Sequence, residues 1–117
     1  MNICRKIVET HDIPYVELES YGFGDEDIAI PIRFATRVID ILQQEVVPIL
    51  GGDLLRYENG EIEFTYDNWG CEIIHPFSVF VTESCDVARK NITEYLFDYK
   101  NETNSIYVNF VLYNERT

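Results

Sequence analysis

The spacing of apolar residues predicts two long amphipathic helices. After Pro31, apolar side chains recur every three or four residues until Pro48 ends the pattern. This first stripe consists of Phe34, Ala35, Val38, Ile39, Leu42 and Val46. The second helix is expected from about Ser78 to Tyr99, and its stripe consists of Val81, Cys85, Ala88, Ile92, Tyr95 or Leu96, and Tyr99. Packing against a core explains both stripes without any further role.

The segment between the two helices has the pattern of a β-hairpin. Residues 49–57 are strand-like, Asn59-Gly60 is the preferred pair for a type I′ turn, and residues 62–66 alternate strictly. Alternation places Ile62, Phe64 and Tyr66 on one face and Glu61, Glu63 and Thr65 on the other. We expect the first face to be buried and the second to be wet and acidic.

The ends of the chain are expected to complete an α+β domain. Ile3, Ile7 and Val8 can line a short helix before Pro14, whereas residues 15–18 are too few to assign. Residues 105–113 form a last strand, and its second face is partly apolar through Tyr107 and Val111. The mixture predicts a small antiparallel β-sheet with two main α-helices packed on one face, in a single domain over residues 1–117.

Charge is the most informative bulk property of the chain. Twenty-one acidic residues against nine basic ones give a formal net charge of −12 among 117 residues. Such a charge disfavours direct binding to nucleic acid or to an anionic membrane surface, and it attracts a basic partner. Net charge alone leaves solubility as an equally good explanation.

The sequence contains no recognisable catalytic or metal-binding pattern. Its two histidines, His11 and His75, do not form a metal-binding spacing, and no nucleophile elbow or phosphate-binding loop is present. Three widely spaced cysteines (Cys4, Cys71 and Cys85) provide neither a zinc clip nor a redox pair. We therefore expect no enzyme activity, no cofactor and no metal. Because a signal peptide and a membrane span are also missing from the pattern, we expect a reduced, cytoplasmic location.

The segment from Gly51 to Cys71 is unusual in its composition. It contains the only tryptophan, Trp69, together with glycines near turns and an Asp67-Asn68 pair. Backbone geometry is the better explanation for Gly51 and Gly52, and packing for Tyr66 and Trp69. An exposed binding anchor remains the alternative for Trp69, although burial is the commoner state.

This segment resembles the immunity protein 40 family. The similar residues are Pro48-Ile49-Leu50-Gly51-Gly52-Asp53, Glu58-Asn59-Gly60 and Thr65-Tyr66-Asp67-Asn68-Trp69, followed by Cys71, with Ser84-Cys85-Asp86-Val87-Ala88 further on. The resemblance covers most of residues 15–112. It implies a bacterial antidote that binds the C-terminal domain of a cognate toxin, and contact-dependent inhibition is one plausible setting. Toxins of this kind are commonly nucleases with basic surfaces, in agreement with the charge of this chain.

Carboxylates in loops and on the wet face of the hairpin are the candidate toxin contacts. They are Asp25, Glu26 and Asp27 in an expected acidic loop, Glu58, Glu61 and Glu63 on the hairpin, and Asp53 and Asp67, both of which could instead be turn acceptors. Two alternatives stay open. One is a small acidic enzyme or ligand-binding domain with a carboxylate-lined pocket near Trp69, and the other is a nucleic-acid mimic with a different protein target. The sequence does not fix the oligomeric state.

Overall fold

A five-stranded antiparallel sheet forms the centre of the molecule, in a computed structural model that describes residues 3–21 and 27–113. Its strands lie in the order β1 (Val16–Glu17), β2 (Ile28–Pro31), β5 (Ile106–Leu112), β3 (Ile49–Glu58) and β4 (Glu61–Gly70). The predicted α+β class is confirmed. The last strand in sequence, β5, lies in the middle of the sheet, which explains why both of its faces carry apolar residues.

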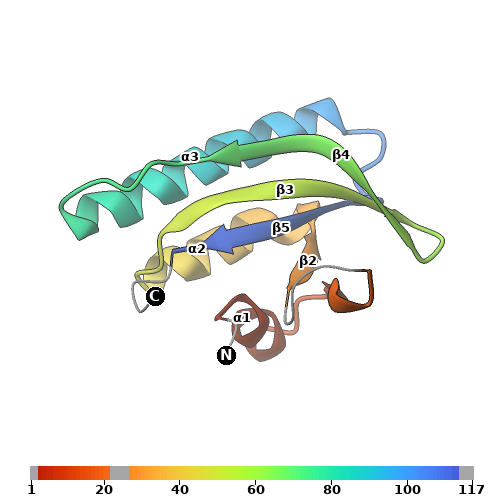
Figure 1. Ribbon diagram of the computed structural model, residues 1–117, viewed down its shortest axis with the longest axis horizontal. Helices are drawn as coiled ribbons and strands as arrows, with labels where there is room; N and C mark the ends of the chain where they lie inside the picture. Colours follow the sequence, from red (N-terminus) through yellow and green to blue (C-terminus); the bar gives the residue numbers. More distant parts are fainter. Residues whose placement is uncertain (1–2, 22–26, 114–117) are drawn as a thin grey trace.

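The two main helices cover one face of this sheet. They are α2 (Ala35–Gln44) and α3 (Phe77–Asp98), which also pack against each other (Figure 1). A shorter helix, α1 (Ile3–Thr10), packs against α2. Short 3₁₀ turns, η1 (Glu19–Tyr21) and η2 (Ile32–Phe34), lie on either side of β2. The arrangement predicted for the main helices is therefore confirmed.

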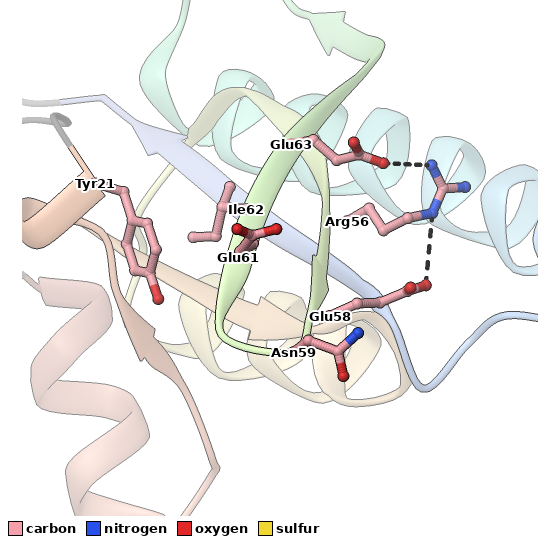
Figure 2. Close-up of a pocket in the computed structure, with 7 residues that line it drawn as sticks. All are labelled: Tyr21, Arg56, Glu58, Asn59, Glu61, Ile62 and Glu63. Carbon is pink, nitrogen blue, oxygen red and sulfur yellow. Dashed lines mark ion pairs between the residues drawn. The ribbon is translucent and has the colours of Figure 1, made fainter.

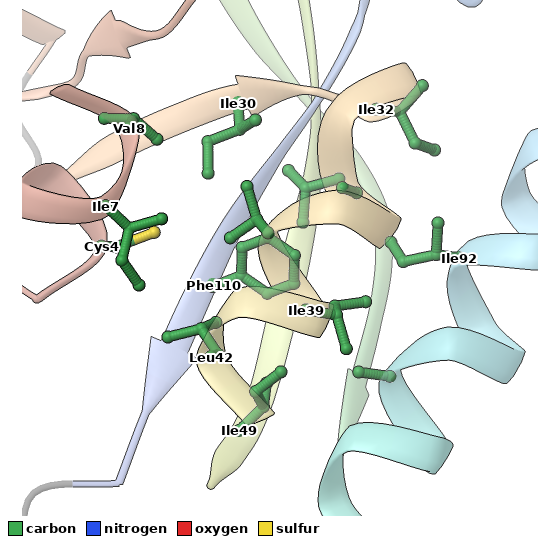
Figure 3. Close-up of a cluster of buried hydrophobic side chains, with 14 of the residues drawn as sticks. Cys4, Ile7, Val8, Ile30, Ile32, Ile39, Leu42, Ile49, Ile92 and Phe110 are labelled. Atoms are coloured by element: carbon green, nitrogen blue, oxygen red, sulfur yellow. The ribbon is translucent and has the colours of Figure 1, made fainter. Parts of the chain in front are cut away.

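One large apolar cluster fills the space between the helices and the sheet. It contains Ile39 and Leu42 from α2, Ile92 from α3 and Phe110 from β5, and none of these side chains is more than 8% exposed (Figure 3). The stripe predicted for α3 is buried from Val81 to Tyr95, whereas Tyr99, just beyond the helix, is half-buried. A buried serine, Ser84, joins α3 to β3, because its Oγ accepts a hydrogen bond of 3.0 Å from the Ile49 backbone N–H.

Trp69 is buried, which confirms the packing interpretation. Its ring lies over Gly52, the residue opposite it on β3, and a Cβ added to Gly52 would stand 2.4 Å from the indole. Phe110 and Tyr95 contact the same ring, with centroids 6.0 and 6.3 Å away. Gly52 therefore needs to lack a side chain so that the tryptophan can reach the core.

The prediction for the faces of β4 is wrong for the apolar face, although Glu61 and Glu63 are exposed as predicted. Phe64 is 49% exposed and Tyr66 is 85% exposed, because α3 covers the opposite face of the hairpin, where Leu54 and Trp69 lie. The turn itself is as predicted, with positive φ angles of 53° at Asn59 and 78° at Gly60.

Two details of the chain path also differ from the expectation. The sequence pattern does not predict strand β2, whose four residues are all buried. Its first two residues pair with β1, and its last two, Ile30 and Pro31, pair with β5. Val46 does not belong to the buried stripe of α2. It lies beyond the end of that helix with a φ of 60° and is 55% exposed, whereas Val47 is buried.

Candidate functional site

The tip of the β3–β4 hairpin contains a hollow lined mainly by polar residues. Figure 1 shows this tip projecting beyond the end of α3. The hollow has a volume of about 620 Å³ and is lined by Tyr21, Arg56, Glu58, Asn59, Glu61, Ile62 and Glu63 (Figure 2). We refer to it as the hairpin-tip hollow. Three of its lining residues are carboxylates that the sequence analysis selected, so folding brings these three together.

Register explains why the three glutamates meet. Glu58 lies opposite Glu61 across the turn, and Arg56 lies opposite Glu63. Directly opposed residues of an antiparallel pair point to the same face, and residues two apart on one strand do so as well. Glu58, Glu61 and Glu63 therefore share one face of the hairpin, and all three are exposed to solvent.

Arg56 is the cation of this site. Its guanidinium lies 2.8 Å from Glu102, 3.5 Å from Glu63 and 4.0 Å from Glu58. The hydrogen bond to Glu102 is the main cause of a raised pKa for Arg56. Since the lining contains one guanidinium and the three carboxylates of Glu58, Glu61 and Glu63, the hollow keeps an excess of negative charge. The side chains of Glu58 and Glu63 remain 51% and 70% exposed, so a cationic partner can reach them.

A tyrosine contact fixes the position of the hairpin tip. The Tyr21 hydroxyl, on η1, donates a hydrogen bond of 2.7 Å to the carbonyl oxygen of Gly60. Its ring meets that of Tyr57 edge-on at 6.4 Å, and Tyr57 in turn contacts Tyr107 at 5.4 Å. The N-terminal segment is thereby linked to the turn, and this bracing limits the motion of a hairpin that projects from the sheet.

The other predicted site residues lie apart from this hollow. Asp53 is half-buried further along β3, and Asp67 accepts a hydrogen bond from the Tyr99 hydroxyl of α3. Asp67 therefore helps to attach β4 to α3. Asp27 is half-buried just before β2, and its backbone carbonyl accepts a hydrogen bond of 2.9 Å from the Leu18 N–H. Asp25 and Glu26 lie outside the described residues.

Sequence reasoning missed Tyr21, Arg56, Asn59 and Ile62 as lining residues. Tyr21 could not be placed from sequence, because the Gly60 carbonyl that it contacts lies 39 positions further along the chain. Arg56 offered a weak signal. A lone cation two residues before Glu58 and opposite Glu63 is expected to pair with them once the hairpin register is known.

The cysteines have the properties of structural thiols. Cys4 and Cys85 are buried, and burial raises the pKa of both thiols, that of Cys4 to about 12. Burial together with the nearby Glu83 and Glu72 also raises the pKa of the half-buried Cys71. Because the thiolate is the nucleophilic form, these environments oppose reactivity.

The described residues give little support for a metal site or for a ligand pocket near Trp69. Among these residues, no group of three or more His, Cys, Asp or Glu side chains could hold a metal ion. Trp69 is packed in the core cluster and does not line the hairpin-tip hollow. Within the same residues, no helix is both long enough and apolar enough to cross a membrane.

These features define an acidic α+β domain with an exposed, carboxylate-lined hollow that is suited to binding a cationic surface. A family model, described as immunity protein 40, matches residues 17–112 of the chain. The chain therefore belongs to the immunity protein 40 family, as its resemblance from Gly51 to Trp69 predicted. Membership in an immunity family indicates toxin neutralisation by a protein that is generally not an enzyme. No curated protein matches the chain.

Proposed function

We propose that this protein neutralises a cognate bacterial toxin by stoichiometric binding, with Glu58, Glu61 and Glu63 facing a basic surface of the toxin. The observation that carries the proposal is the convergence of these three exposed carboxylates around one hollow, in a family of immunity proteins. The whole molecule is also negatively charged, with a formal net charge of −12. A basic partner is therefore attracted at long range and paired at short range.

The proposed toxin is a nuclease. A nuclease must hold phosphate groups, and it does so with lysine and arginine side chains that a carboxylate can pair with in place of phosphate. Electrostatic attraction of this kind can raise an association rate roughly 10-fold to 1,000-fold at low salt. A fast association suits an antidote, because the toxin must be captured before it reaches its own substrate.

The proposed setting is the cytoplasm of a bacterium that either produces the toxin or receives it from a neighbour by contact. The partner is then the C-terminal domain of a toxin encoded in the reading frame directly upstream. The purified pair should form a 1:1 complex, and expression of this chain should protect cells that express the toxin domain. A toxin domain that neither binds this chain nor is neutralised by it in cells would contradict the proposal.

Charge variants test the hairpin-tip hollow as the electrostatic contact. In the Glu61→Gln, Glu63→Gln double variant we expect association with the toxin to slow by about 10-fold at low salt and to depend less on salt concentration. The matched control is Glu94→Gln, Asp98→Asn, which removes the same charge from exposed positions on α3. Equal slowing in both variants would mean that net charge matters and the hollow does not.

A further inference from the structure

A pair of exposed aromatic side chains lies on β4, separate from the residues that line the hairpin-tip hollow. Phe64 is 49% exposed and Tyr66 is 85% exposed, and their ring centroids are 6.2 Å apart with an angle of 35° between the planes. We refer to these two residues as the β4 aromatic pair. Leu55, which lies opposite Phe64 on β3, is fully buried. The boundary between the covered and the exposed part of this sheet face therefore lies between β3 and β4. Exposed aromatic side chains that lie side by side at such a border are suited to contact with another molecule.

The ring of Tyr66 contributes little to the stability of the fold, and the backbone conformation of this residue lowers that stability. Its φ of 68° is in the left-handed region, which glycine and asparagine tolerate and bulky residues avoid. The ring does not offset this strain by burial, because it is almost fully exposed. Its neighbours in the chain do serve the fold, since Asp67 binds Tyr99 and Trp69 fills the core. Exposed residues held in strained backbone conformations are concentrated at functional sites.

The position of the pair makes β4 accessible from outside. In the sheet order β1-β2-β5-β3-β4, this ten-residue strand lies at the edge, with β3 as its neighbour. Glu61 and Glu63 project from the same strand. Charges on an edge strand discourage pairing with a second, equally charged copy, and the net charge of −12 adds to that repulsion. The same charges favour a cationic partner.

Exposed aromatic rings favour arginine among the cationic side chains. A planar guanidinium can stack flat on an aromatic face, which a compact ammonium group cannot do. Tyrosine, arginine and other large side chains also dominate the binding energy of protein interfaces, where a few central residues carry most of the affinity.

We propose that β4 is the centre of the toxin interface, with Phe64 and Tyr66 as anchors that stack against an arginine-bearing surface of the toxin. This inference rests on the proposed function and adds to it the residues that hold the complex together. The glutamates of the hairpin-tip hollow then govern how fast the partners meet, and the β4 aromatic pair governs how slowly they separate.

The test uses the full chain and the purified C-terminal domain of the toxin encoded directly upstream. Tyr66→Gly removes the ring and suits the left-handed backbone, so the variant should fold at least as well as the parent protein. We expect it to bind the toxin domain at least about 10-fold more weakly, mainly through faster dissociation. Phe64→Thr, which retains a good strand former, should show a similar loss. The control is Phe97→Ala, which removes an exposed ring from α3 and should change affinity by less than about 2-fold.

The salt dependence of binding distinguishes the role of the β4 aromatic pair from the role of Glu61 and Glu63. At high salt the effect of Glu61→Gln, Glu63→Gln should shrink, whereas the loss in Tyr66→Gly should persist. Parent-like affinity in both aromatic variants would overturn the proposal and leave toxin binding itself intact. An equal loss in Phe97→Ala, or self-association of the parent that Tyr66→Gly abolishes, would also overturn it. Failure of the parent protein to bind the toxin domain would overturn the proposed function, and this inference with it.

Discussion

The two faces of the β3–β4 hairpin differ in what they contribute. On one face, Leu54 and Trp69 are buried beneath the helices in the large core cluster. On the other, Leu55 joins a small cluster with Leu18 and Ala29, and beyond it Phe64 stands in solvent. The covered face carries the larger share of the buried apolar residues, whereas the open face carries the exposed aromatic pair. The predictions below test this division, from the largest expected effect to the smallest.

Gly52→Val should have the largest effect on the covered face. A Cβ at this position already stands 2.4 Å from the Trp69 ring, and two further methyl groups would push the tryptophan out of the core. We expect a loss of about 4 kcal/mol or more in the free energy of unfolding, measured by urea denaturation. The control is Gly70→Ala on β4, where a Cβ would meet no heavy atom closer than 3.9 Å. A Gly52→Val protein as stable as Gly70→Ala would show that Trp69 does not require the space over Gly52.

Adjacent leucines on β3 allow the two faces to be compared directly. Leu54 and Leu55 are both fully buried, but Leu54 belongs to the large cluster and Leu55 to the small one. We expect Leu54→Ala to lower the free energy of unfolding by about 4 kcal/mol and Leu55→Ala by about 2 kcal/mol, because the small cluster can relax into the space left behind. Equal losses in denaturant titrations would mean that the open face stabilises the fold as much as the covered one.

The helices and the hairpin turn could be predicted from sequence because each depends on local periodicity. The stripe of α3 and the Asn59-Gly60 turn need no knowledge of the rest of the chain. Strand β2 could not be found in this way. The strand is only four residues long and fully buried, and its Ile30 and Pro31 pair with residues of β5 that lie more than seventy positions away.

The candidate site was predictable only in part, for a related reason. Alternation correctly separated Phe64 from Glu63, but it could not show which face the helices would cover, because that depends on where α3 docks. The apolar face of β4 was therefore assigned to the core, although it is the open one. Tyr21 and Arg56 join the hollow through tertiary contacts, and no local pattern reveals these.

Alkaline pH should lower the stability of the fold in part through the buried thiol of Cys4. Burial raises the pKa of this thiol from 9.0 to about 12, so the folded protein keeps a proton that the unfolded chain releases. Stability is therefore unaffected below pH 9 and falls as pH rises from 9 toward 12. At pH 10.5 the cost is about 2 kcal/mol.

Urea titrations of Cys4→Ala and Cys71→Ala between pH 8 and pH 10.5 check this expectation. Tyrosines with raised pKa values, such as Tyr99, steepen the decline in every variant, so the difference between the two variants isolates Cys4. The decrease in the free energy of unfolding with rising pH should be smaller in Cys4→Ala than in the parent protein. It should stay close to that of the parent in Cys71→Ala, whose thiol is only half-buried. Parallel slopes in both variants would exclude the Cys4 mechanism.

Substitution of Val46 has the smallest expected effect, and it is the control for the Tyr66 variant on the open face. Like Tyr66, it is an exposed residue with a positive φ, 60° against 68°, but it ends a helix instead of lying on β4. The Val47 N–H bonds to the Leu42 carbonyl across this helix end, an arrangement that glycine suits best. Val46→Gly should therefore raise the free energy of unfolding by about 1 kcal/mol and leave toxin affinity unchanged. Tyr66→Gly relieves similar strain, so if both variants lost affinity for the toxin domain, relief of strain and not the loss of the aromatic ring would be the cause.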